Sequence, residues 1–154
     1  MGHDNRRIRP VEIGMVELDA DNPDFGFELV CQPEHQDALR RAVDTSHAGP
    51  LGARPMVLVW LVPEPLNGLD RHSIAVWTQH GQVGHVPRET ADAMAPHLAR
   101  FVHEREAYPA TSGVIFGGDE ADPGYSIYLA IRASDMRAAN RKPAPPIHRR
   151  SIAA

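Results

Sequence analysis

Cysteine and lysine are almost absent from this sequence of 154 residues. Cys31 is the only cysteine, so the chain can form neither an internal disulfide nor a zinc site built from several thiolates. Because Cys31 ends an apolar segment, we expect it to be a buried small hydrophobe rather than a nucleophile. Lys142 is the only lysine and lies near the C-terminus, which excludes a P-loop and a Schiff-base lysine in the core.

Long apolar runs are missing as well. The longest run, 56–62, is much shorter than the roughly 20 residues that span a bilayer. The first residues are polar and basic, without the apolar region of a secretory signal. We therefore expect a cytoplasmic protein that makes no membrane contact.

The motifs of common hydrolases do not occur. There is no His-Glu-x-x-His and no Gly-x-Ser-x-Gly sequence, and His97 and His103 are too far apart to share a helical face as i, i+4 residues do. A minor alternative is a metal-dependent nuclease that uses Glu64 and Asp70, but a core lysine and a regularly spaced third carboxylate are missing. We expect no enzymatic activity, metal or cofactor.

Proline and glycine are abundant, with 14 and 12 residues, which favours short strands joined by turns. Apolar patterns predict one or two strands within 6–18 and further strands over 25–31, 56–62, 73–78, 82–86, 110–116 and 125–131. Helical spacing predicts helices over 34–43 and 88–104. The second should bury Ala91, Met94, Leu98 and Phe101 and should kink or break at Pro96. These elements predict a mainly β fold, a small, partly open barrel of about six strands with one or two short helices.

We expect an N-terminal extension over 1–24 with one or two strands, a domain over 25–132 and a tail over 133–154, and charge is uneven among them. The domain carries eight arginines against 13 carboxylates, the opposite of the balance expected for a domain that follows a phosphate backbone. The tail is basic and rich in proline and alanine, so we expect it to be disordered. Four of its cations form either a nucleic-acid arm or a solvated terminus: Arg141, Lys142, Arg149 and Arg150.

Residues 63–76 read PEPLNGLDRHSIAV, and residues 81–91 read GQVGHVPRETA. The first stretch is similar to an acidic-Pro-x-Asn-Pro-x-Asp-x-Asn-Ala-Ile-x-Val segment, and the second to a Gly-x-x-Val-Gly-Tyr/His-Leu-x-x-Glu-x-Ala block. In this order and spacing the sequence resembles the HIRAN family, over roughly 25–132. The resemblance implies an OB-like barrel. From members fused to helicase-like transcription factors it also implies capture of the 3′-hydroxyl end of single-stranded DNA at stalled replication forks, in a DNA-repair setting.

The resemblance implies a DNA-end site of five residues. Asp70 would accept a hydrogen bond from the terminal 3′-hydroxyl and Asn67 would contact the terminal nucleotide, unless both residues only hold the turn. His85 would contact the DNA backbone and Arg88 a phosphate. The alternatives are a half-buried strand histidine and a solvated arginine. Phe116 would stack on a base or, alternatively, pack in the core.

Three positions differ from the DNA-binding members of this family. Glu34 and Leu69 occupy the positions of two tyrosines that sandwich the terminal bases, and Pro33 replaces an arginine of the first loop. Base–aromatic stacking contributes roughly 1–3 kcal/mol per base, so these replacements should weaken DNA binding. Two predictions therefore stay open: a non-enzymatic module that binds single-stranded DNA ends, or a module of the same fold that binds a protein partner or a second copy of itself.

Overall fold

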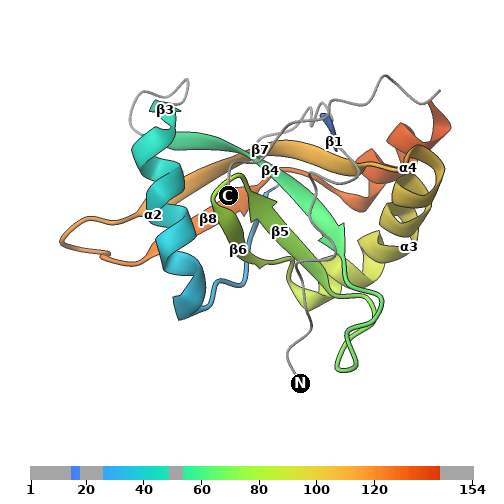
Figure 1. Cartoon of the computed structure of the whole chain (residues 1–154), viewed down its shortest axis with the longest axis horizontal. Helices are drawn as coiled ribbons and strands as arrows, with labels where there is room; N and C mark the ends of the chain where they lie inside the picture. The colour runs from blue at the N-terminus through green and yellow to red at the C-terminus, as the bar shows by residue number, and fades with distance from the viewer. Residues whose placement is uncertain (1–14, 18–25, 49–53, 143–154) are drawn as a thin grey trace.

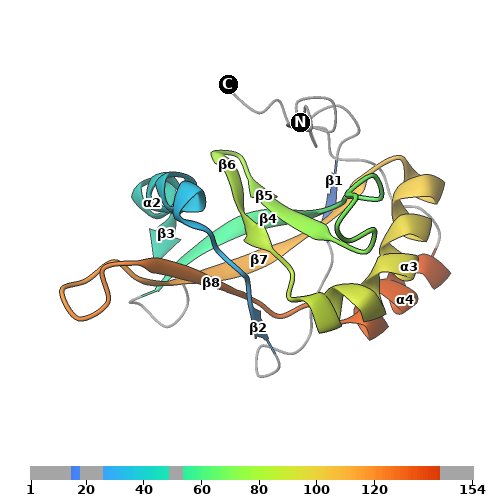
Figure 2. The ribbon, with the colours of Figure 1, turned by 90° about the horizontal axis from the view of Figure 1, so that it is seen from below.

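The computed structural model describes residues 15–17, 26–48 and 54–142. The elements are β1 (Met15–Glu17), β2 (Phe27–Glu28), η2 (Pro33–His35), α2 (Gln36–Thr45), β3 (His47–Ala48), β4 (Pro55–Pro63), β5 (Ile74–Thr78), β6 (Gly81–His85), α3 (Arg88–Arg105), β7 (Tyr108–Gly117), β8 (Tyr125–Leu129) and α4 (Ala133–Arg141). All the described strands belong to one sheet, with α2 at one end of the sheet and α3 and α4 at the other end (Figure 1). The sheet curls into a small, partly open, OB-like barrel (Figure 2), which confirms the predicted mainly β fold.

β4 lies at the centre of the sheet. The strand order is β2-β8-β7-β4-β5-β6, and every step is antiparallel. β1 adds in parallel to β7, and β3 adds to β4. Val59 and Leu61 of β4 face the inner core, whereas Trp60 and Val62 join a second apolar cluster on the other face. Burial on both faces explains why this segment is a continuous apolar run rather than an alternating one.

Among the residues that the structure describes, a single pair joins the two edges of this sheet. Directly after β2, the N–H of Val30 donates to the carbonyl of His85 at 2.8 Å, and the N–H of His85 donates to the carbonyl of Val30 at 3.0 Å. Gly84 allows this approach, because a Cβ at that position would lie 2.8 Å from the Val30 carbonyl oxygen. The barrel is therefore closed at one point and open elsewhere along this seam.

Two helices complete the core of the barrel. α2 buries Ala38, Leu39 and Ala42. α3 buries the four residues predicted for its inner face, Ala91, Met94, Leu98 and Phe101. Of the two outcomes predicted at Pro96, a kink or a break, the break does not occur, since α3 continues through this residue. Figure 2 shows the helix bending along its course, as is usual for a helix with an internal proline.

α4 corrects the prediction that the chain is disordered from residue 133 onward. Met136 and Asn140 are four residues apart and are both buried against the domain. The buried guanidinium of Arg105 donates to the carbonyls of Ala139 and Lys142 at 2.6 and 2.8 Å, near the end of α4. Alanine and basic residues dominate the composition of this segment, so one buried methionine and one buried asparagine were too weak a signal to find it.

Some predictions fall on residues that the structure does not describe. Within the predicted strand region 6–18, only β1 is described. The tail beyond Lys142, with Arg149 and Arg150, lies outside the described residues. Within the described ranges, no helix combines the length and the apolar character that a membrane span requires.

Candidate functional site

An open pocket of about 520 Å³ lies between η2, α2, β6 and the first residue after β4. Its wall is polar and contains three carboxylates and three histidines: Glu34, Asp37, Glu64, His35, His80 and His85. The pocket holds no arginine or lysine among its described lining residues. Such a wall suits a group that donates hydrogen bonds and disfavours a phosphate.

Glu64 is the most enclosed carboxylate of this pocket. Its Oε1 accepts a hydrogen bond from Ser73 Oγ at 2.8 Å and lies 3.0 Å from His85 Nε2. Burial acts to raise the pKa of Glu64, but hydrogen bonds from His85, Ser73 and Asn67 outweigh it and hold that pKa below the usual range. Glu64 is therefore ionised at neutral pH, with lone pairs left to accept a further hydrogen bond.

His35 is a buried lining residue of the pocket and lies next to His85. Its Nδ1 accepts a hydrogen bond from the backbone N–H of Gln32 at 3.0 Å, and its ring centroid lies 6.1 Å from that of His85. Burial lowers the pKa of His35, the charge of Glu34 opposes this, and His85 adds to the lowering. A neutral His35 keeps its Nδ1 available as an acceptor, which holds the η2 turn in place.

The strand register connects this pocket to an aromatic group on the outer face of the barrel. Phe116 pairs with Ser126 across β7 and β8. Val30 follows Leu29, whose N–H donates to the carbonyl of Ile127, and Val30 pairs with His85. Four side chains therefore form one outer row, in the order Phe116, Ser126, Val30 and His85. Three strand spacings of about 4.8 Å place Phe116 roughly 15 Å from His85.

The far end of this outer row is aromatic and cationic. Phe116 belongs to neither apolar core cluster, so the core-packing alternative is wrong. Its ring meets Tyr128 edge-on at a centroid distance of 5.0 Å, and Arg54 Cζ lies 3.9 Å from its centroid. Val30 and Tyr128 are among the few large hydrophobic side chains that are exposed. This end brings two aromatic rings and one positive charge together.

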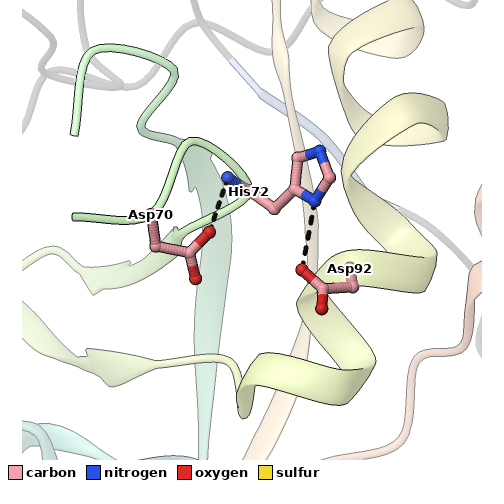
Figure 3. A group of neighbouring side chains, drawn as sticks. All are labelled: Asp70, His72 and Asp92. Carbon is pink, nitrogen blue, oxygen red and sulfur yellow. Dashed lines mark hydrogen bonds and ion pairs between the residues drawn. The ribbon is translucent and has the colours of Figure 1, made fainter. Parts of the chain in front are cut away.

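Asn67 and Asp70 hold the β4–β5 loop, as the alternative for both residues predicted. Asn67 Oδ1 accepts the backbone N–H groups of Leu69 and Asp70 at 3.0 and 3.3 Å, and Asp70 Oδ1 accepts that of His72 at 2.9 Å. Asn67 also interacts with Glu64, so it adjoins the pocket. Asp70 does not line the pocket and is turned toward His72 (Figure 3).

The predicted cationic contacts lie apart from the pocket lining. Arg88 is exposed at the first residue of α3. Arg141 and Lys142 are exposed at the end of α4, which Figure 2 shows beside α3, on the side of the molecule away from α2. The structure therefore brings His85 and Asn67 to Glu64 and places Phe116 in one row with His85, but it does not bring Arg88 or Arg141 to the pocket.

The three positions that differ from DNA-binding HIRAN-like sequences lie in different places in the structure. Glu34 lines the pocket beside His85, whereas Leu69 is 97% exposed at the tip of the β4–β5 loop. Pro33 begins η2 and is exposed. Cys31 is half-buried, and burial together with the charge of Glu28 raises its pKa, which disfavours the thiolate that a nucleophile needs.

The sequence predicted His85 but not the roles of Glu64 and His35 in the pocket. It indicates Glu64 only as a nuclease ligand with Asp70, but the group of close metal-binding side chains that the described residues form contains Asp70, His72 and Asp92 and not Glu64. The useful signal for Glu64 was its place at the end of a buried strand. No signal marked His35, because its role depends on the chain closing between Val30 and His85.

Three comparisons with known proteins were made, and one of them found a match. The family model of the HIRAN domain matches residues 41–113, from α2 through the β4–β5 loop and β6 to β7. No curated protein and no solved structure matches the chain.

Proposed function

The chain carries a domain of the HIRAN family, and we propose that this domain is a non-enzymatic module that binds single-stranded DNA at an unphosphorylated 3′ end. The family suggests nucleic-acid binding in general. The end preference is supported by the pocket, whose ionised Glu64 would accept the hydrogen bond of a sugar hydroxyl and repel a terminal phosphate.

The observation that carries this proposal is the outer row. It places Phe116 on the same face as His85, roughly 15 Å away by three strand spacings. A terminal nucleotide held at Glu64 and His85 would lead its strand across Val30 toward Phe116 and Tyr128. There an aromatic ring can stack on a base and Arg54 can meet a phosphate.

Asp70 has a different part in this proposal from the one that the sequence implied. Its Oδ1 is occupied by the N–H of His72, and it does not line the pocket. Glu64 supplies the hydroxyl acceptor instead, and Asp70 shapes the loop that carries Asn67. The two carboxylates can be compared directly, because Glu64→Gln and Asp70→Asn each remove one charge while keeping the side-chain shape.

Fluorescence anisotropy with short oligonucleotides that end in a 3′-hydroxyl or a 3′-phosphate tests the proposal. We expect the wild type to favour the 3′-hydroxyl by about tenfold or more, since one repelled charge costs more than about 1.4 kcal/mol at a half-buried site. Glu64→Gln should bring this ratio close to one, and Asp70→Asn should keep it. Equal, weak binding of both oligonucleotides that modest salt abolishes would reject end recognition. Loss of the ratio in Asp70→Asn alone would reject the role of Glu64.

A second candidate function, contact with a protein, rests on the tip of the β4–β5 loop. Leu66 and Leu69 are 78% and 97% exposed there, and exposed apolar side chains that cluster often mark an interface. If this loop joins two copies of the chain, light scattering will show a mass that rises with concentration. Leu66→Ser combined with Leu69→Ser should then return the protein to a monomer, and a wild type that stays monomeric throughout excludes self-association.

A further inference from the structure

Three side chains from separate parts of the chain meet beside the β4–β5 loop. Asp70 and His72 come from this loop, and Asp92 comes from the second turn of α3. Their ligand atoms, two carboxylate oxygens and one imidazole nitrogen, all lie within 4.8 Å of one another. Figure 3 shows the two carboxylates on either side of His72.

The local hydrogen bonds orient this group. The backbone N–H of His72 holds Asp70 Oδ1 at 2.9 Å, and His72 Nδ1 lies 3.1 Å from Asp92 Oδ1. Two ligand atoms that each bind one Zn²⁺ at about 2.0–2.1 Å are themselves about 3 to 3.4 Å apart. The His72–Asp92 pair therefore already has the spacing of two neighbouring ligands.

The charges around the group are unbalanced. Asp70 and Asp92 bring two carboxylates together, and among the described residues no arginine or lysine forms an ion pair with either of them. His72 and Asp92 are about half exposed, with side-chain exposures of 56% and 51%. A cation could enter from solvent without rearrangement of the fold and would keep water on its remaining coordination positions.

We propose that Asp70, His72 and Asp92 bind one divalent first-row metal ion of the Zn²⁺ type. Imidazole and carboxylate ligands together suit Zn²⁺, and three protein ligands leave at least one position for water. Binding would use the lone pair of His72 Nδ1, and the imidazole would then carry its N–H on Nε2. The ion would then tie the β4–β5 loop to α3, and it would add to the His72–Asp92 contact that already links them.

Zinc titration in the presence of a chromophoric chelator measures this site without any nucleic acid, so its result is independent of the proposed DNA binding. The chain has nine histidines, and the difference between matched variants is therefore the readout. We expect one Zn²⁺ to bind per wild-type chain, and His72→Ala and Asp92→Asn each to weaken that binding by more than about tenfold. Zn²⁺ should also raise the melting temperature of the wild type but not of these variants.

Two control variants match these changes on the same helix. Glu89→Gln removes another exposed carboxylate of α3, and His103→Ala removes an exposed histidine. Both should bind Zn²⁺ like the wild type. Co²⁺ adds a spectroscopic check, because its visible absorption should change on binding to the wild type and not to Asp92→Asn. Absent binding, or equal binding by all five proteins, would overturn the site, and circular dichroism without metal verifies that each variant is folded.

Discussion

The two ends of the outer row differ in almost every physical property. At one end, Glu64 and His85 are half-buried, hydrogen-bonded and fixed by Ser73 and the barrel seam. At the other end, Phe116 and Tyr128 meet at the surface beside Arg54. The first end has a carboxylate in a defined position, which suits recognition of one chemical group. The second has aromatic rings and a cation, which suit any base and any phosphate.

On this face of the barrel, we expect the pocket end to supply specificity for the DNA end and the aromatic end to supply affinity. Discrimination between a hydroxyl and a phosphate requires a charge held in place, and only the pocket end has one. Stacking requires no fixed polar partner, so the aromatic end can contribute binding energy for either kind of DNA end. The Val30–His85 bridge joins the two ends, since it links the segment directly after β2 to β6, which carries His85.

The largest effect on stability should come from Gly84→Ala, which disturbs the Val30–His85 bridge. The new Cβ would lie 2.8 Å from the backbone carbonyl oxygen of Val30 and 3.2 Å from Leu29 Cβ. Because the nearest atom belongs to the backbone, it cannot move away without disturbing the hydrogen bonds between Val30 and His85. We expect a loss of about 1–3 kcal/mol in the free energy of unfolding, typical of overpacking. Urea unfolding measures it, and DNA-end discrimination should fall as His85 shifts away from Glu64.

Two other glycines serve as controls for this prediction. At Gly113, a Cβ would also come within 2.8 Å of a neighbour, but that neighbour is Cδ1 at the flexible end of Ile127. At Gly68 a Cβ would meet nothing within 4 Å. We expect Gly113→Ala to cost less than Gly84→Ala, and Gly68→Ala to cost least. An equal cost at Gly84 and Gly68 would show that the seam tolerates opening.

An intermediate effect should follow from Phe116→Ala at the aromatic end. Loss of one stacking ring should weaken DNA binding by about 1–3 kcal/mol, and by the same factor for oligonucleotides with a 3′-hydroxyl and with a 3′-phosphate. Anisotropy titrations of both oligonucleotides measure this. Tyr128→Phe keeps the neighbouring ring and removes only the hydroxyl that donates to Glu28, so its affinity should stay close to that of the wild type. A change in the hydroxyl-to-phosphate ratio in Phe116→Ala would contradict the separation of the two ends.

The sequence predicted the strands of this face but not the face itself. The apolar patterns located β4 to β8 within a few residues, because burial on one or both faces selects the residue types. The outer row depends on three registers at once. These are the pairing of β7 with β8, the pairing of β8 with the segment directly after β2, and the pairing of Val30 with His85. No local pattern encodes these registers. α4 was missed for a related reason, since Arg105, 34 residues before Ala139, holds it in place.

The candidate residues were predictable only where a short segment carries them. The stretch 63–91 located Asn67, Asp70 and His85, and the structure places Asn67 and His85 next to Glu64. The function of Asp70 was harder to predict, because a carboxylate that caps a turn and one that accepts a ligand have the same sequence context. Only the folded loop brings its Oδ1 to the N–H of His72.

The smallest effect should be a change in the pH dependence of stability at the pocket end. Burial lowers the pKa of His35 in the folded protein, so below the ordinary histidine pKa of about 6.5 the unfolded chain binds a proton that the folded chain refuses. Stability from this residue is therefore complete above that pH and declines as the pH falls below it.

His35→Asn, which keeps an acceptor for the Gln32 N–H, should flatten the decline in urea unfolding between about pH 6.5 and pH 5. Glu64 has the same sign in a lower window, because its lowered pKa means that stability is lost as the pH falls below the ordinary glutamate value. Phe116→Ala removes no titrating group and should keep the wild-type slope, so a flattened slope in that variant would show that the pH dependence does not arise in the pocket.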